Sequence, residues 1–203
     1  TLGAGTVVKL NSSLTVNGTL IANGTASAPV VFTALSDDSY GGDTNGDGGA
    51  TTPTPASWRH LYFSPSSTGS SLTYTRVRYG GNNNLSDTTA RKGAVGVESS
   101  AVSFSHLTVE YSGFHGLALE NSDSTVSDSL FQRSTNVTAE GTGLYVQGGA
   151  PTITASTMSD NLYGAIFSNA GGVFTGNTLS DNTAIAAVFT QIRGALSGNG
   201  GSG

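Results

Sequence analysis

Short segments of alternating apolar and polar residues run along most of this 203-residue chain. Four of them share an apolar first position in the C-terminal half: Phe104, Val126, Ile153 and Phe174. The steps between these positions are 22, 27 and 21 residues, and a second apolar column lies five residues further on: Val109, Phe131, Met158 and Leu179. Short alternation bounded by Gly, Asn, Asp and Ser predicts strands, not helices.

A second set of segments repeats at nearly the same spacing. Each begins with glycine, at Gly93, Gly116, Gly143 and Gly164, with steps of 23, 27 and 21 residues, and a further 22 residues lead to Ala186. Two sets with one period predict coils that stack in register, with strands paired in parallel along one axis and apolar side chains in inward columns. The extra length of the 27-residue step is expected between Ser134 and Gly141. Almost no helix is predicted.

The bends between strands predict a ladder of their own. Eight residues after each repeat start lie Ser112, Ser134, Asn161 and Asn182, and the same offset from Tyr74 gives Asn82. Because Ser and Asn side chains hydrogen-bond readily to nearby backbone, these residues are expected to link the bends of neighbouring coils.

The N-terminal third repeats less regularly. Residues 12–22 alternate as in a strand, residues 34–57 break the pattern, and strand character returns at His60–Phe63. We therefore expect a β-helix over residues 1–193 with a long acidic loop inserted at 34–57. Residues 194–203 are rich in Gly and Ser and read as a linker, a frayed end or a last incomplete coil.

Composition restricts the classes of partner. Only 10% of the residues are charged, against about 25% in an average globular protein, and the net charge is −5. Basic residues cluster only at Arg76/Arg78 and Arg91/Lys92, too few for the phosphate contacts that nucleic-acid binding needs. There is no cysteine, and no apolar run approaches the length of a membrane span. We expect a secreted or cell-surface protein without membrane insertion.

Two stretches of the chain resemble a known group of proteins. The run GTLIANGTASAPVVFTALSDDSYGGDTNGDG (residues 18–48), followed by Trp58–Phe63, is similar to the opening of bacterial surface proteins with right-handed parallel β-helix repeats. The later coil SDNLYGAIFSN (residues 159–169) resembles the pectate-lyase-like repeat. The predicted fold class is therefore all-β, a single right-handed parallel β-helix with about 22 residues per coil. The resemblance implies an exported solenoid but no single activity.

The acidic loop is the one concentrated group of candidate ligands: Asp37, Asp38, Asp43, Asn45 and Asp47. The last three alternate and precede Gly48, as in the opening D-x-N-x-D-G of an EF-type calcium loop. Calcium takes about six to eight oxygen ligands, and clustered carboxylates repel unless a cation neutralises them. The twelfth position, normally Glu, is Thr54 here. We predict a calcium site that orders the loop; the alternative is a solvated acidic loop.

No complete catalytic constellation appears in the sequence. Arg76 and Arg78 share a strand face and are expected to point to solvent. Asp160 and Asp181, and likewise Glu98 and Glu120, lie one coil apart and predict stacked carboxylates without an acid-tuning environment. His106 and His115 have no partner constellation, so we interpret them as packing or turn residues.

These observations predict a non-catalytic extracellular structural or adhesive module. Because a solenoid exposes unpaired backbone at its ends and no capping helix is evident, we expect contacts with other copies, in filaments or a surface layer, or with neighbouring domains of a larger protein. The alternative is a carbohydrate-active β-helix, a polysaccharide lyase or binding module. Its candidate platform is a set of aromatics that otherwise stack beside the core: Tyr62, Tyr74, Tyr79, Tyr111 and Tyr145.

Overall fold

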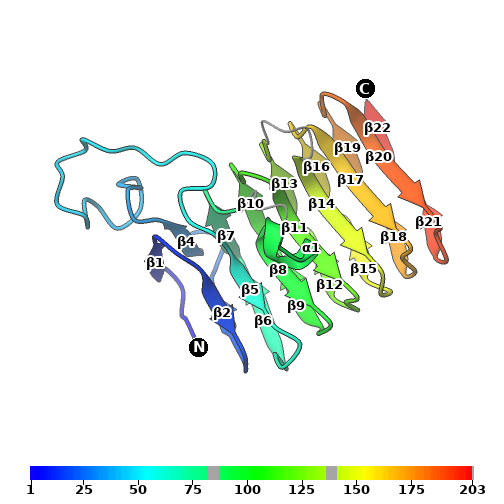
Figure 1. Ribbon diagram of the computed structural model, residues 1–203, viewed down its shortest axis with the longest axis horizontal. Helices are drawn as coiled ribbons and strands as arrows, with labels where there is room; N and C mark the ends of the chain where they lie inside the picture. The colour runs from blue at the N-terminus through cyan, green and yellow to red at the C-terminus, as the bar shows by residue number, and fades with distance from the viewer. Residues whose placement is uncertain (82–86, 136–140, 203) are drawn as a thin grey trace.

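The chain winds into a right-handed parallel β-helix whose strands stack along one axis (Figure 1). The computed structural model describes residues 1–81, 87–135 and 141–202. Successive coils pass through three sheets in turn, so each strand pairs in parallel with its equivalent one coil away. This arrangement confirms the predicted fold class.

The chain passes through sheets 1, 2 and 3 in that order in each coil. Sheet 1 has eight strands: β1 (Val7–Leu10), β4 (Val30–Ala34), β7 (Thr75–Arg78), β10 (Thr108–Glu110), β13 (Leu130–Gln132), β16 (Thr157–Ser159), β19 (Thr178–Ser180) and β22 (Gly200–Ser202). Sheet 2 has seven: β2 (Leu14–Val16), β5 (Leu61–Phe63), β8 (Gly93–Glu98), β11 (His115–Glu120), β14 (Thr142–Gln147), β17 (Tyr163–Ser168) and β20 (Ile185–Thr190). Sheet 3 also has seven: β3 (Ile21–Asn23), β6 (Ser70–Thr73), β9 (Val102–Ser105), β12 (Thr125–Ser127), β15 (Thr152–Thr154), β18 (Val173–Thr175) and β21 (Ala195–Ser197).

The predicted apolar columns are present. In sheet 3, Phe104 pairs with Val126, Val126 with Ile153, and Ile153 with Phe174. The column that begins at Val109 is equally regular in sheet 1. These side chains fill the interior and are at most 5% exposed. Burial of apolar surface at this density is the main force that holds the coils together.

One predicted register was wrong by one residue. Gly93 pairs with His115, not with Gly116, so this step is 22 residues instead of 23. A one-residue slip of the strand would turn every inward side chain outward. The inward apolar residues therefore fix the register, and the position of the glycine does not. The buried Val95 and Val97 instead set it by pairing with Leu117 and Leu119.

Each strand from β6 to β21 is followed directly by a residue with positive φ, where the chain turns toward the next sheet. After sheet 1 these corner residues are Tyr79, Tyr111, Arg133, Asp160 and Asp181. After sheet 2 they are Ser99, Asn121, Gly148, Asn169 and Gln191, and after sheet 3 they are Tyr74, His106, Asp128, Ala155, Gly176 and Gly198. This conformation costs most L-residues energy, and Gly, Asn and Asp tolerate it best.

The predicted ladder at the bends is confirmed for Asn161 and Asn182, whereas the Ser112 hydroxyl bonds within its own turn and the Ser134 hydroxyl has no hydrogen-bond partner among the described residues. Asn161 Oδ1 accepts a hydrogen bond from the Ser134 amide at 2.9 Å, and Asn182 Oδ1 accepts one from the Asn161 amide at 3.1 Å. Asn82, expected in the same ladder, lies outside the described residues, as do residues 136–140 of the long step. A second ladder was not predicted: the amides of Ser129, Ser156 and Asn177 donate to Ser156, Asn177 and Asn199 in the next coil.

Helical structure is almost absent, as expected. In the part of the chain that the structure describes, α1 (Thr89–Lys92) is the single helix, and it lies over sheet 2. It packs closely enough that a Cβ on Gly96 would lie 1.9 Å from the Ala90 carbonyl oxygen. No described helix has the length and apolarity to cross a membrane. Residues 194–203 contain β21 and β22, the last strands of the stack.

Candidate functional site in the acidic loop

Residues 35–57 leave sheet 1 at the end of β4 and extend from the N-terminal part of the stack (Figure 1). The last contact with the ladder is a hydrogen bond from the Leu35 amide to the Leu10 carbonyl at 2.9 Å. A turn follows, closed by a hydrogen bond from the Asp37 amide to the Ala34 carbonyl at 3.0 Å. The two adjacent aspartates therefore stand at the base of the loop.

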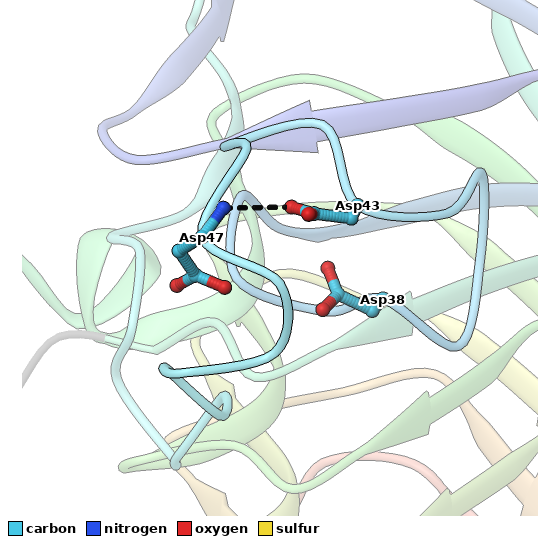
Figure 2. A group of neighbouring side chains, drawn as sticks. All are labelled: Asp38, Asp43 and Asp47. Atoms are coloured by element: carbon cyan, nitrogen blue, oxygen red, sulfur yellow. Dashed lines mark hydrogen bonds between the residues drawn. The ribbon is translucent and has the colours of Figure 1, made fainter.

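Three carboxylates converge within the loop. One oxygen each of Asp38, Asp43 and Asp47 lies within 4.8 Å of the others (Figure 2). Asp38 comes from the base of the loop, and Asp43 and Asp47 come from its outer turn. Carboxylate oxygens are the ligands that Ca²⁺ prefers, and their number and spacing decide which ion fits.

The Asp43 carboxylate organises the outer turn. Its Oδ1 accepts hydrogen bonds from the amides of Gly46 (2.7 Å) and Asp47 (3.1 Å), and its Oδ2 accepts one from Gly48 (2.8 Å). Gly46 and Gly48 have φ values of 72° and 64°, a region that glycine enters at little cost. The D-x-N-x-D-G spacing therefore produces a closed turn around Asp43.

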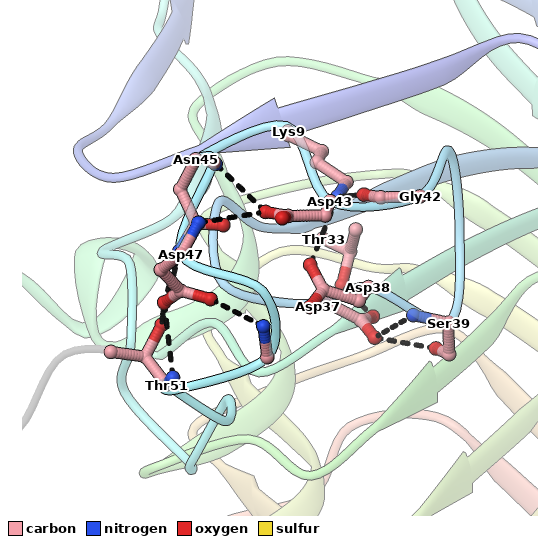
Figure 3. Close-up of polar contacts among 12 residues, drawn as sticks. Lys9, Thr33, Asp37, Asp38, Ser39, Gly42, Asp43, Asn45, Asp47 and Thr51 are labelled. Atoms are coloured by element: carbon pink, nitrogen blue, oxygen red, sulfur yellow. Dashed lines mark hydrogen bonds and ion pairs between the residues drawn. The ribbon is translucent and has the colours of Figure 1, made fainter.

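The Asp47 carboxylate closes the next turn. It accepts hydrogen bonds from the amides of Gly49, Ala50 and Thr51 at 2.8, 3.0 and 3.0 Å, and from the Thr51 hydroxyl (Figure 3). The Thr51 hydroxyl is the main cause that lowers the pKa of the Asp47 carboxyl from its ordinary value. Asp47 therefore stays ionised at neutral pH, as a cation ligand must.

The other two predicted ligands lie differently. Asn45 turns its amide nitrogen toward Asp47 Oδ2 (2.8 Å) and Thr51 Oγ1 (3.0 Å), so it supports the turn as a donor. Asp37 lies outside the three-carboxylate group, because its side chain bonds to Arg78 at 3.0 Å and to the hydroxyls of Thr33 and Ser39. The structure thus brings together three of the five predicted residues as carboxylates, and calcium binding stays a prediction.

Lys9 is a member of the site that sequence reasoning missed. Its side chain is only 7% exposed, its Nζ lies 3.9 Å from Asp38 Oδ1, and it donates to the Gly42 carbonyl (Figure 3). Three carboxylates and one ammonium leave the group with a formal charge of −2. Sequence spacing did not indicate it, because Lys9 reaches the loop base only through the pairing of β1 with β4, in which it lies beside Thr33.

The expectation that both arginines of β7 point to solvent was wrong for Arg78. Its side chain is 13% exposed, its Nη1 donates to Asp37, and its Nε lies 2.8 Å from Glu110 Oε1. Arg76 is 37% exposed and lies 3.3 Å from the same carboxylate oxygen. A buried guanidinium needs several partners, and the base of the acidic loop supplies one of them.

The predicted carboxylate pairs form no open acidic site. Glu98 and Glu120 are in register on sheet 2, but Glu98 accepts the Tyr62 hydroxyl and Glu120 accepts the Ala90 amide at 3.0 Å. Burial and this bond to Glu98 raise the pKa of Tyr62. Asp160 and Asp181 are exposed corner residues in the positive-φ column. Both pairs therefore have structural explanations.

Most of the candidate aromatic platform is engaged in ring contacts. Ring centroids are 5.2 Å apart for Tyr79 and Tyr111 and 4.2 Å apart for Tyr74 and His106. His115 stacks on Tyr145 at 4.5 Å. Guanidinium groups lie over Tyr79 and Tyr111 as well, from Arg78 and Arg133. These stacks match the interpretation of the two histidines as packing or turn residues.

Comparison with known proteins supports the same architecture. The family model described as "Right handed beta helix region" matches residues 92–199, which is more than half of the chain. No curated protein and no solved structure matches this chain. The matched region covers the regular coils from β8 to β21. The chain therefore belongs to the right-handed β-helix family.

Proposed function

We propose that this chain is a non-catalytic extracellular scaffold or adhesive module that carries a calcium-ordered loop. The observation that supports it most directly is the pairing of the groups that could do chemistry. Arg78 forms ion pairs with both Asp37 and Glu110, and Glu98 and Glu120 bond to Tyr62 and to the α1 backbone. A catalytic acid, base or nucleophile needs free access to a substrate, whereas a scaffold needs rigid, satisfied coils.

The small share of charged residues, 10%, fits a protein that works outside the cell. Small neutral side chains cover much of the outer surface, especially on sheet 3. Its outward residues include Ser103, Thr125 and Thr152 in one register column and Ser105, Ser127 and Thr154 in the next. Such a surface does not depend on net charge for its contacts.

Calcium is the cation we propose for the loop. The group of Asp38, Asp43, Asp47 and Lys9 has a formal charge of −2, which a divalent ion neutralises. Asp43 and Asp47 come from turns already closed by backbone amides, so the ordering left for the ion is to hold these turns against Asp38 at the loop base. Ca²⁺ accepts irregular sets of oxygen ligands, whereas Mg²⁺ demands a near-ideal octahedral shell, so this group suits Ca²⁺ better.

The calcium proposal is tested by thermal unfolding with the ion and with a chelator. We expect Ca²⁺ to raise the Tm and EDTA to lower it, because an ion that binds only the folded state stabilises it. Asp43→Asn should abolish the shift. Asp160→Asn is the matched control, since Asp160 is an exposed carboxylate on a corner far from the loop. No shift of the wild-type protein in either direction would remove calcium from the proposal.

The C-terminal end of the stack supports a role in assembly. Ile185 and Phe189 on β20 are 49% and 37% exposed, and they are the large apolar side chains that are most accessible in the described residues. Phe189 extends the interior stack of Phe167 and Phe174. We propose that another copy or a neighbouring domain of a larger protein covers this end. Sedimentation of the wild type and of Phe189→Asp tests self-association. It requires that the average molar mass rise with protein concentration in the wild type and not in the variant.

The carbohydrate-active alternative has less support, because the rings of Tyr79, Tyr111 and Tyr145 already have stacking partners. It remains open to a direct test. A panel of neutral and acidic polysaccharides is incubated with the protein, and unsaturated products and retention on polysaccharide gels are measured. Product formation or selective retention would favour this alternative over the inert scaffold.

A further inference from the structure

Two cations flank the strand from which the acidic loop leaves. Lys9 on β1 pairs with Thr33 on β4. On the other side, Val31 and Phe32 pair with Arg76 and Val77, so Thr33 stands next to Arg78 in the same register. Lys9, Thr33 and Arg78 thus form one column across three adjacent strands of sheet 1. The column meets the base of the loop, where Asp37 and Asp38 follow.

Arg78 holds the Asp37 side of the loop base. Its Nη1 donates to Asp37 Oδ2 at 3.0 Å and to the Ser39 hydroxyl at 2.8 Å, and its guanidinium lies 5.1 Å from the centre of the Tyr40 ring. The two charged side chains are 13% and 3% exposed. Removal of one partner from a buried ion pair leaves the other charge uncompensated, so this contact has a large effect on docking.

Lys9 holds the Asp38 side. Its ammonium lies 3.9 Å from Asp38 and donates to the carbonyl of Gly42 further along the loop. The loop also packs on the stem of this side chain, because a Cβ on Gly41 would lie 3.6 Å from Lys9 Cε. Consecutive aspartates are therefore divided between two cations that come from the coils on either side of β4.

We infer that Lys9 and Arg78 form an ionic clamp that docks the acidic loop onto the β-helix without a metal ion and, through Asp37 and Asp38, positions the carboxylate group. In this arrangement Asp37 is an anchor and not a ligand, and Arg78 is a positioning residue. The docking half of the inference is independent of calcium. The positioning half rests on the proposed calcium site.

The docking half is tested by chymotrypsin cleavage after Tyr40 in EDTA. Tyr40 lies at the loop base and contacts Arg78, so a released loop exposes it. Arg78→Gln should increase the cleavage rate by at least about tenfold, because the Asp37 charge loses its partner. Arg78→Lys should protect Tyr40 partially from cleavage, since lysine keeps the charge but lacks the several N–H donors of the planar guanidinium. Lys9→Gln should also accelerate cleavage.

Arg76→Gln is the matched control, because Arg76 lies on the same strand, binds Glu110 and has no contact with the loop among its hydrogen bonds and ion pairs in the structure. Its cleavage rate should equal that of the wild type. Hydrogen exchange of β11 and β14 verifies that each variant keeps the folded helix. A wild-type cleavage rate in a folded Arg78→Gln protein would overturn the clamp.

Calorimetric titration with CaCl₂ tests the positioning half. We expect Arg78→Gln to bind Ca²⁺ more weakly than the wild type, and Arg76→Gln to bind with unchanged affinity. Equal affinity of Arg78→Gln and the wild type would overturn the positioning role. Absence of binding by the wild type would refute the calcium proposal itself, while the cleavage rates would still decide whether the clamp exists.

Discussion

The coils from β8 onward and the coils that precede them satisfy their buried polar groups in different ways. In the later coils, Ser and Asn side chains pass hydrogen bonds from one bend to the next, as Asn177 does between Ser156 and Asn199. The earlier coils also use Ser hydroxyls, as Ser70 accepts from the Leu20 amide, but there a charged side chain in addition joins distant segments, as Arg78 joins Asp37 and Glu110. The first arrangement repeats with the coil, whereas the second is built once, around a single inserted loop.

This difference teaches where stability and where adaptability lie in the molecule. Repeated neutral ladders make each coil depend on its immediate neighbours, which is the usual behaviour of solenoids. Ion pairs across an insertion depend on particular partners far apart in sequence. We expect the later coils to respond mainly to packing changes and the earlier coils to respond also to charge and pH.

The largest expected effect comes from the apolar column of the later coils. Phe131→Ala removes a fully buried ring between Val109 and Met158, and we expect a loss of about 3–5 kcal/mol in the free energy of unfolding. Denaturant unfolding measures it. Leu130→Ala on the same strand points outward and should cost far less. Equal costs for both variants would mean that the column does not carry the stability of this region.

A smaller effect is expected from the polar ladder. Asn177→Ala leaves the Ser156 amide and the Ile153 carbonyl without their partners, at present 3.0 and 3.1 Å away. Buried unsatisfied groups of this kind cost about 1–3 kcal/mol. Thr178→Ala, an exposed neighbour, is the control for the same unfolding measurement. If the two variants are equally stable, the ladder contributes nothing to the free energy of unfolding, and the contrast with the earlier coils disappears.

The smallest effect concerns pH in the earlier coils. Burial lowers the pKa of His60, which lies 2.9 Å from the Arg91 carbonyl. The unfolded chain therefore binds a proton more readily than the folded chain, and stability is lost as the pH falls below about 6.5. Hydrogen exchange of β5 should accelerate as the pH falls from 7 to 5, by less than either substitution above changes the free energy of unfolding. His60→Gln should remove this local dependence, and His106→Gln, at an exposed corner, should keep it.

The sequence was sufficient to predict the later coils because their positions recur. The column from Phe104 to Phe174 and the ladder through Asn161 both follow the same steps, and the structure confirms both. The missed ladder through Ser156 and Asn177 carries the same spacing and could have been found. The register error at Gly93 arose because glycine was aligned in place of the inward valines.

The clamp could not be predicted in this way. The step from Val31 to its partner Arg76 spans 45 residues because the loop intervenes, so no period connects β4 to β7. Local spacing gathered the loop carboxylates into one candidate group, and Asp38, Asp43 and Asp47 do converge. It could not show that Asp37 faces a guanidinium 41 residues away. Partners supplied across an insertion become visible only when the strand pairing is known.

The left-handed residue that follows each strand from β6 to β21 has a consequence for how such a chain can vary. Because the strands between these corners set the circumference of the coil, the corners can accept additional length, and the segments from β8 to β9 and from β11 to β12 already differ in length. The acidic loop leaves at the same edge of sheet 1, directly after β4, where the following residue has no positive φ. New loops can therefore be inserted at the corners between sheets while the strands of the hydrophobic interior keep their spacing. One β-helix can in this way present different loops to its surroundings.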